Sequence, residues 1–176
     1  MIPRLFNSIA DEHGTNTTVT NLCDNWDEFC NQNIIHQLFY GRMKSVFKCN
    51  VCGNSHSKYV PCSILHLSVP LKKGAKQDEK DVEKLLRKEY FGSTDTVTID
   101  CSYCRKKTDC LKQYNMDKCP PCLIVMLKRY KMKDDTITKI DTNMKYPFSM
   151  TLEGCQYKLK SVLCHEGTLC KGHYFV

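Results

Sequence analysis

Four cysteines in two Cys-x-x-Cys pairs are the residues whose types and spacing point most directly to chemistry. The pairs are Cys49-Asn-Val-Cys52 and Cys101-Ser-Tyr-Cys104. Two thiolates three residues apart on a tight turn can face one ion, and two such turns supply the four sulfur ligands of a closed tetrahedral zinc site. The alternative is that all four are buried core cysteines, which would not need to be paired. The sequence therefore favours one structural zinc ion.

The segment between the two pairs, residues 53–100, is 48 residues long. A compact zinc ribbon has a shorter spacing. The chain must therefore leave the metal site and return to it, carrying an amphipathic helix that we expect over Lys76 to Tyr90. Metal binding would cross-link two distant hairpins, and structural zinc contributes roughly 10–16 kcal/mol of apparent binding free energy in small peptides.

The remaining cysteines do not suggest a disulfide framework. The chain has 13 cysteines, an odd number, and its start lacks the pattern of a secretory signal. Cys119-Pro-Pro-Cys122 resembles a redox motif, but the strand-like run Leu123 to Leu127 follows it, and redox motifs usually begin a helix that lowers the thiol pKa. We expect Cys119 and Cys122 to be core cysteines.

A second cluster of possible metal ligands lies near the end of the chain. Its members are Cys164, His165, Cys170 and His173. The residues between them, Glu166-Gly167-Thr168, are typical of a plain hairpin loop. We therefore expect no second metal site.

The elements that would position these residues are mostly strands. Helical spacing occurs at Leu5 to Glu12, Asn33 to Tyr40 and Lys76 to Tyr90. Gly41 could cap the second of these in a left-handed conformation. Strand patterns cover Ser45 to Cys52, Ser57 to Val69, Thr96 to Ile99, Thr108 to Met116, Leu123 to Lys131, Ile137 to Ile140, Tyr157 to Cys164 and Gly172 to Val176. The sequence predicts the α+β class, with a mostly antiparallel sheet.

Composition and charge narrow the possible partners. The 176 residues suffice for one domain or a large part of one, and 41% of them are hydrophobic. No apolar run could cross a bilayer, so we expect no membrane partner. The net charge is +7, but between Lys72 and Glu89 seven basic residues alternate with five acidic ones, as on a solvated helix face. A zinc-dependent nucleic-acid binder is the least favoured hypothesis, and we expect no nucleic acid and a cytoplasmic or nuclear location.

Three ordered blocks resemble the ubiquitin-specific proteases. They are "IIHQLFYGRMKSVFKCNVCGNSHSKYVPCSILHLSVP", "CSYCRKKTDCLKQYNMDKCPPCLIVMLKRY" and "YKLKSVLCHEGTLCKGHYFV". The first is similar to the opening of that family's fingers, the second to its second cysteine turn and the strand beyond, and the third to its histidine box. The blocks span residues 34–176, and Leu5 to Glu12 resembles the end of the family's thumb helix.

This resemblance implies the fingers and palm of a papain-like cysteine protease without its thumb. It divides the chain at about residues 1–33 (end of the thumb and linker), 34–118 (zinc-carrying fingers) and 119–176 (a palm that is cut short). The expected partners are ubiquitin and ubiquitinated proteins. The implied reaction is hydrolysis of an isopeptide or peptide bond after the C-terminal glycine of ubiquitin.

The resemblance also assigns roles to single residues. Cys49, Cys52, Cys101 and Cys104 become the zinc ligands. His173 becomes the catalytic base, and Gly172 and Tyr174 become substrate-binding residues. A cysteine protease needs an imidazole within hydrogen-bond reach of its thiol, to take the proton and later return it to the leaving amine. His165, on the partner strand, is expected to be structural.

Two departures from the family pattern leave the activity open. No cysteine box is present, and the segment Asn21-Leu-Cys-Asp-Asn25, which contains Cys23, has only a superficial similarity to one. The Asp or Asn that orients the histidine in this family would lie beyond Val176. The main hypothesis is a fragment of an active deubiquitinase whose nucleophilic cysteine lies outside this chain. The alternative is a catalytically dead ubiquitin-binding module with structural zinc.

Overall fold

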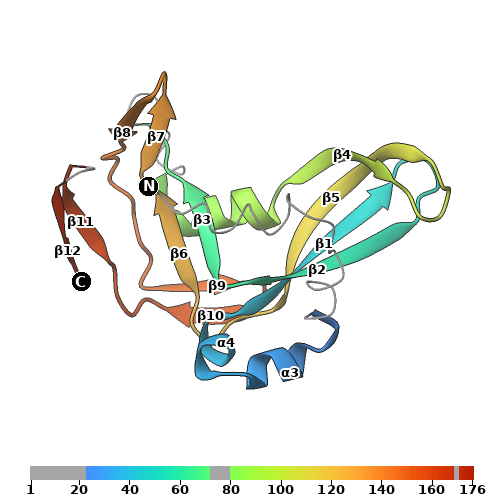
Figure 1. The fold of residues 1–176 in the computed structure, drawn as a ribbon, viewed down its shortest axis with the longest axis horizontal. Coiled ribbons are helices and arrows are strands. Elements are labelled where there is room, and N and C mark those ends of the chain that lie inside the picture. Colours follow the sequence, from blue (N-terminus) through green and yellow to red (C-terminus); the bar gives the residue numbers. More distant parts are fainter. Residues whose placement is uncertain (1–22, 72–79, 169–170) are drawn as a thin grey trace.

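A four-stranded antiparallel sheet, in the order β2-β1-β5-β4, is the largest element of the fold. The computed structural model describes residues 23–71, 80–168 and 171–176. The strands are β1 (Gly41–Cys49), β2 (Ser55–Cys62), β4 (Thr94–Asp100) and β5 (Lys107–Lys118). Alternate residues of β1 are buried, from Gly41 to Cys49, as expected for a strand with one face on a core. We call these strands the extended sheet, and Figure 1 shows it reaching away from the rest of the molecule.

Four strand pairs make up the other half of the molecule. β3 (Ile64–Ser68) runs parallel to β6 (Ile124–Lys128). The antiparallel hairpins are β7 (Tyr130–Lys133) with β8 (Thr136–Lys139), β9 (Ser149–Leu152) with β10 (Cys155–Lys158), and β11 (Cys164–Gly167) with β12 (Gly172–Phe175). The β11–β12 hairpin and the tip of the extended sheet lie at opposite ends of the long axis (Figure 1).

Short helices complete the fold. They are α3 (Trp26–Asn31), α4 (Ile34–Phe39) and α5 (Val82–Leu86), which continues as one π-helical turn, η2 (Arg87–Phe91). The Asp81 carboxylate caps α5 by accepting from the backbone N–H groups of Glu83 and Lys84. No helix among the described residues is long and apolar enough to span a membrane. The helix expected over residues 5–12, and the start of the one expected from Lys76, lie outside the described residues.

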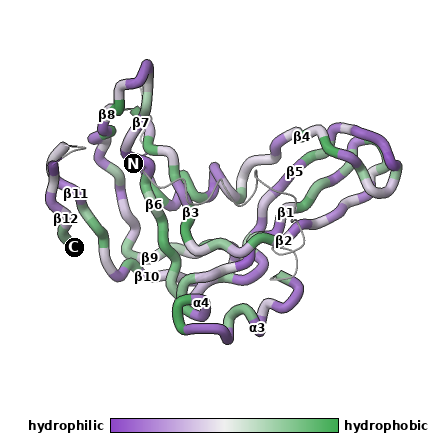
Figure 2. The backbone as a smooth tube through the Cα atoms, in the orientation of Figure 1, coloured by the Kyte–Doolittle hydropathy of each residue, from purple (hydrophilic) through white to green (hydrophobic). Residues whose placement is uncertain are grey.

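Two separate hydrophobic cores hold the chain together. The main core joins the base of the extended sheet to the strand pairs and α5, and it contains Met43, Leu65, Leu67, Val69, Val82, Leu85, Leu86, Met116, Ile140, Met144 and Leu152. The small core contains Phe47, Cys49, Cys101 and Cys110. Figure 2 shows the same contrast, because many residues along β3 and β6 are hydrophobic, whereas those at the tip of the extended sheet are mostly hydrophilic. The tip therefore has little apolar burial of its own.

The α+β, mostly antiparallel fold is confirmed, with local corrections. The strand expected over Ser57 to Val69 is divided into β2 and β3, and the one expected over Leu123 to Lys131 into β6 and β7. Gly41 does not cap α4 in a left-handed conformation, because Tyr40 ends that helix in an extended conformation and Gly41 begins β1. A Cβ at Gly41 would lie 2.7 Å from both the Lys118 carbonyl oxygen and Pro120 Cδ, so the glycine is required for close packing.

A further correction concerns the strand expected over Tyr157 to Cys164. The structure divides it between β10 and β11, with residues 159–163 outside any strand. It also adds β9, which pairs with β10 through a turn at Glu153 (φ 48°) and Gly154 (φ 83°). A Glu-Gly pair is a weaker hairpin signal than Asn-Gly or Asp-Gly, which explains why the hairpin was not predicted.

Candidate metal centre and histidine hairpin

Two turns with equivalent backbone hydrogen bonds form the tip of the extended sheet. In the turn between β1 and β2, the Gly53 N–H donates to the Cys49 carbonyl (3.0 Å). In the turn between β4 and β5, the Arg105 N–H donates to the Cys101 carbonyl (2.8 Å). The residue after each second cysteine is left-handed, with φ 72° at Gly53 and 52° at Arg105. Each Cys-x-x-Cys pair is therefore folded by its own local backbone.

These turns bring the four cysteine sulfurs together. All four Sγ atoms lie within 4.8 Å of one another, although 48 residues separate the two pairs in sequence. The Cys49 and Cys104 sulfurs are 3.9 Å apart, and those of Cys52 and Cys101 are 3.7 Å apart. A regular tetrahedron with zinc–sulfur bonds of about 2.3 Å has edges of about 3.8 Å. The group can hold one metal ion, and its geometry fits tetrahedral zinc.

The backbone prepares these thiols for metal binding. The backbone N–H of Cys52, with help from that of Val51, lowers the pKa of Cys49 to about 6. The backbone N–H of Cys104 likewise lowers the pKa of Cys101. Desolvation raises the pKa of Cys104 to about 12, which favours its protonated thiol. Because metal ligands must be deprotonated, metal binding would release that proton.

A fifth cysteine lies directly beneath the group. Cys110 on β5 is fully buried and is the cross-strand partner of Cys49. Its thiol points to the Thr108 carbonyl (3.9 Å), and burial raises its pKa. It does not belong to the four-sulfur group, and it serves as packing for the small core. Thr108 and Cys110 are two residues apart in a predicted strand, so both side chains lie on the same face, and this spacing is the sequence signal for the buried position of Cys110.

At the other end of the molecule, His173 lies on the β11–β12 hairpin. Its cross-strand partner is Glu166, and its side chain is exposed. Within the part of the chain that the structure describes, its ring has a neighbour in Phe175, with centroids 6.4 Å apart, and it forms no side-chain hydrogen bond. The structure therefore brings the four predicted metal ligands together, whereas His173 lies on a different hairpin, away from them.

The neighbouring strands hold the β11–β12 hairpin through His165. The His165 Nδ1 atom lies 3.2 Å from the Tyr130 hydroxyl, and its ring packs against Tyr174 with centroids 4.5 Å apart. The Lys139 ammonium donates to the carbonyls of His165 (3.1 Å) and Gly167 (2.8 Å). Tyr130 and Lys139 face each other on the β7–β8 hairpin. These contacts agree with the expectation that His165 is structural.

Gly172 and Tyr174, the predicted substrate-binding residues, flank His173 on the same strand. A Cβ at Gly172 would overlap the His165 ring and lie 2.7 Å from the Glu166 carbonyl oxygen. The missing side chain thus makes room for His165 within the hairpin. Tyr174 has 64% of its surface exposed, and its ring lies against that of His165.

Cys23 has the surroundings of a structural cysteine. It is 3% exposed, and its carbonyl accepts a hydrogen bond from Arg42 (2.7 Å) at the base of the extended sheet. Burial raises the pKa of its thiol, the opposite of what a nucleophile needs. Arg42 in turn pairs with Asp117 (2.6 Å).

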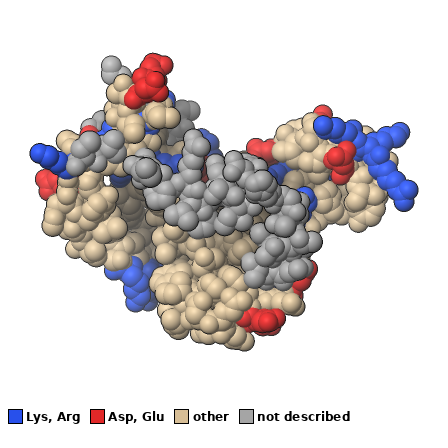
Figure 3. All heavy atoms as spheres, in the orientation of Figure 1, with Lys and Arg blue, Asp and Glu red and all other residues tan. Residues whose placement is uncertain are grey.

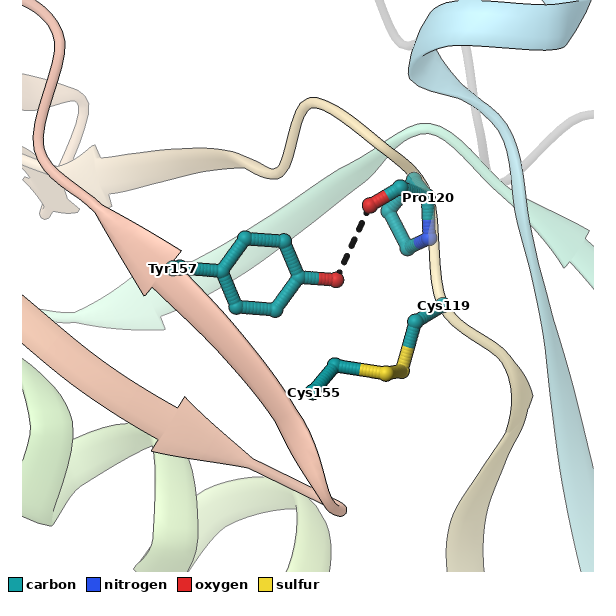
Figure 4. The surroundings of a disulfide bond; sticks show 4 residues. All are labelled: Cys119, Pro120, Cys155 and Tyr157. Atoms are coloured by element: carbon teal, nitrogen blue, oxygen red, sulfur yellow. Dashed lines mark hydrogen bonds between the residues drawn. A yellow bond between two sulfur atoms is a disulfide. The ribbon is translucent and has the colours of Figure 1, made fainter.

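One pair of cysteines departs from the expectation. Cys119 forms a disulfide with Cys155, the first residue of β10 (Figure 4). Cys122 is exposed, so the expectation that Cys119 and Cys122 are both core cysteines is wrong. No local sequence pattern indicates this pairing, because the two cysteines are 36 residues apart and meet only through the β9–β10 hairpin.

Comparisons with known proteins agree on one family. The sequence profile of the family described as ubiquitin carboxyl-terminal hydrolase matches residues 4–176. The chain is 31% identical over 147 residues to the probable ubiquitin carboxyl-terminal hydrolase 8 of Schizosaccharomyces pombe, covering 80% of this chain and 30% of that protein. It is 28% identical over 149 residues to ubiquitin carboxyl-terminal hydrolase 2 of Gallus gallus, covering 80% and 42%. The chain spans less than half the length of these relatives.

Solved structures show a related fold. The SAGA DUB module Ubp8/Sgf11/Sus1/Sgf73 bound to ubiquitin aldehyde matches with a TM-score of 0.66 and 23% identity, over 81% of this chain and 34% of that chain. A variant of the same module bound to monoubiquitin matches with a TM-score of 0.68 and 24% identity, over 81% and 33%. At this level of identity the likeness concerns the fold.

Proposed function

Because this chain belongs to the ubiquitin carboxyl-terminal hydrolase family, whose members are cysteine proteases, we propose that it forms the ubiquitin-binding and general-base part of a deubiquitinase. The reaction would be thiol-dependent hydrolysis of an isopeptide or peptide bond after the C-terminal glycine of ubiquitin. The nucleophilic cysteine would come from outside these 176 residues. Ubiquitin and ubiquitinated proteins are the proposed partners, in the cytoplasm or nucleus, with no part for nucleic acid or a membrane.

The observation that carries this proposal is the position of His173. Its side chain is exposed on a short hairpin, and the contacts of Tyr130 and Lys139 with β11 fix that hairpin against the neighbouring strands. A general base must be held rigidly yet remain open to the group it deprotonates. His173 would take the proton of the nucleophilic thiol and return it to the leaving amine, while Gly172 and Tyr174 border the path of the ubiquitin tail.

We assign zinc to the four-cysteine group, with a structural role. Cys49, Cys52, Cys101 and Cys104 would hold one ion as four thiolates, which is the usual ligand set of a closed structural zinc site. The bound ion would join two turns that are far apart in sequence and so keep the extended sheet in shape. It would lie at the tip of the extended sheet, at the other end of the molecule from the β11–β12 hairpin that carries His173, and take no part in proton transfer (Figure 1).

Titration of labelled ubiquitin against the purified, zinc-loaded chain tests the proposal. We expect saturable binding in the micromolar range, because the extended sheet presents one preformed surface. No binding at high micromolar concentration of the chain would contradict the proposal.

A catalytically dead ubiquitin-binding module is the second candidate. It is favoured by the absence, among the described residues, of any cysteine in contact with His173. Both candidates bind ubiquitin, so binding does not separate them. A chimera in which this chain replaces the matching segment of the chicken relative does, because only a working base allows the nucleophile of that relative to turn over substrate.

A further inference from the structure

The disulfide between Cys119 and Cys155 joins two separate parts of the fold. Cys119 follows the end of β5, where the extended sheet returns to the main core, and Cys155 begins β10. Their Cα atoms are 6.6 Å apart, within the range that a disulfide can span. The closed loop contains β6 to β9, so the bond ties the start of that segment to its end.

Residues 118–122 are a junction at which several elements meet. The Lys118 carbonyl and the Pro120 ring pack on Gly41, where β1 begins. The Cys122 N–H donates to the Leu38 carbonyl of α4 (2.8 Å). The Tyr157 hydroxyl of β10 donates to the Pro120 carbonyl (2.9 Å), beside the disulfide (Figure 4). A change in the conformation of residues 118–122 would therefore alter contacts with both the extended sheet and the β9–β10 hairpin.

The pair is within reach of small reagents. Cys119 and Cys155 are both half-buried, and Cys119 packs against the main core. Cys122, three residues from Cys119, is an exposed free thiol on the same segment. The hydrogen bond from Tyr157 to Pro120 does not involve either sulfur, so we expect it to hold the hairpin near residue 119 when the disulfide is reduced. The two sulfurs then stay near enough to rejoin.

We propose that Cys119 and Cys155 form a reversible oxidation site that locks the β9–β10 hairpin to the base of the extended sheet. The oxidant is a low-molecular-weight disulfide such as oxidised glutathione. One cysteine thiolate attacks that disulfide, forming a mixed disulfide and releasing one glutathione thiolate. The second cysteine thiolate then attacks the protein sulfur of the mixed disulfide and releases the second glutathione. Two protein thiols are oxidised and one glutathione disulfide is reduced to two thiols.

Locking this junction acts on the proposed ubiquitin-binding function, on which this part of the inference rests. The β9–β10 hairpin leads through residues 159–163 to the β11–β12 hairpin that carries His173. The cross-link restricts the hairpin relative to the extended sheet, so less conformational freedom is lost when a partner contacts both. We expect the oxidised chain to bind ubiquitin about fivefold more tightly, at the lower end of common coupling strengths.

The test equilibrates the zinc-loaded chain across a series of glutathione redox ratios. Differential alkylation with mass spectrometry then identifies the oxidised cysteines, while zinc content, Tm and ubiquitin affinity are measured on the same samples. We expect one two-electron transition confined to Cys119 and Cys155, with constant zinc and a rise in Tm of about 5–10 °C. Cys155→Ser should abolish the transition, and the matched control Cys122→Ser should leave it unchanged.

Three outcomes decide the matter. If Cys119 and Cys155 stay reduced at every ratio, or oxidise only together with loss of zinc, the oxidation site is wrong. If the bond forms but ubiquitin affinity equals that of Cys155→Ser, the coupling to binding is wrong. If neither redox form binds ubiquitin while the alkylation pattern and Tm change as expected, the oxidation site stands and the proposed function fails.

Discussion

At the residue scale, the four-cysteine group depends on sulfurs whose protonation is influenced by nearby backbone N–H groups and by desolvation. The N–H groups of Cys52 and Val51 lower the pKa of Cys49 and so favour its thiolate, whereas desolvation raises the pKa of Cys104 and favours its thiol. A bound ion removes this difference, because all four ligands must be thiolates. Each sulfur is thus needed for the ion, and the neighbouring Cys110 is needed only for packing.

Cys104→Ser should therefore lose zinc, and Cys110→Ala should keep it. Removing one of four thiolate ligands leaves an incomplete tetrahedral site, and the hydroxyl of serine does not ionise at neutral pH. Cys110 lies in the same small core but outside the four-sulfur group. Metal analysis of both purified variants measures the effect, and equal zinc content in the two would contradict the assignment of the ligands.

His173 is the residue on which the proposed chemistry depends. In the chimera with the chicken relative, His173→Ala should lower the turnover of a ubiquitin substrate by about 10²–10⁴-fold, the usual contribution of a general base. Ubiquitin binding by the same variant should change little, because the loss of one exposed imidazole leaves the extended sheet and the neighbouring Gly172 and Tyr174 in place. A chimera that turns over substrate equally well without His173 would show that this histidine is not the base.

At the element scale, the two turns at the tip use different residues for the same backbone conformation. Gly53 adopts its left-handed φ without steric cost, whereas Arg105 adopts it with a Cβ that opposes it. Arg105, Lys106 and Lys107 are all exposed, and Figure 3 shows basic side chains gathered over this end of the extended sheet. The arginine therefore contributes charge at some conformational cost.

Substitutions at Gly53 and Arg105, the equivalent left-handed positions, should have different effects on stability. Gly53→Ala should lower the free energy of unfolding of the zinc-loaded chain by about 1 kcal/mol, since it introduces a left-handed alanine. No atom lies within 4 Å of the new Cβ, so the change reports backbone strain alone. Arg105→Gly should leave stability unchanged or raise it slightly. Denaturant unfolding of both variants measures this, and a large loss in Arg105→Gly would mean that the arginine side chain makes a stabilising contact.

The sequence predicted some elements well and others poorly, for physical reasons. The cysteine turns, α4 and most strands have strong local patterns, and they lie close to where they were expected. The β9–β10 hairpin has only the weak turn signal of Glu153-Gly154, and the Cys119–Cys155 disulfide joins residues 36 apart that share no local pattern. The π-helical turn after Leu86 is also unmarked, since Arg87 to Phe91 continue the same amphipathic spacing.

At the scale of the whole molecule, the two cores differ in what stabilises them. The main core buries large aliphatic side chains from both halves of the chain, whereas the small core has only four buried residues, three of them cysteines, among those the structure describes. So little apolar burial cannot offset the conformational entropy of ordering the tip. The outer part of the extended sheet should therefore depend on the metal and the main core should not.

Zinc removal by a chelator should unfold the tip locally. We expect backbone amide exchange to accelerate around Phe47 and Cys110 and to remain slow in β3 around Leu65 and Leu67. Hydrogen exchange read by mass spectrometry follows both regions in one experiment. Uniform acceleration across the whole chain would show that the zinc group and the main core unfold as one unit.

The most direct test of the central claim measures ubiquitin affinity and zinc content together in three forms of the chain. These are the unmodified chain, Cys104→Ser and the matched control Cys110→Ala. If the metal-held extended sheet is what binds ubiquitin, the unmodified chain and Cys110→Ala should bind at micromolar concentration with one zinc each, and Cys104→Ser should lose both zinc and binding. Undiminished ubiquitin binding by a zinc-free Cys104→Ser chain, or no binding by the zinc-loaded unmodified chain, would contradict the account.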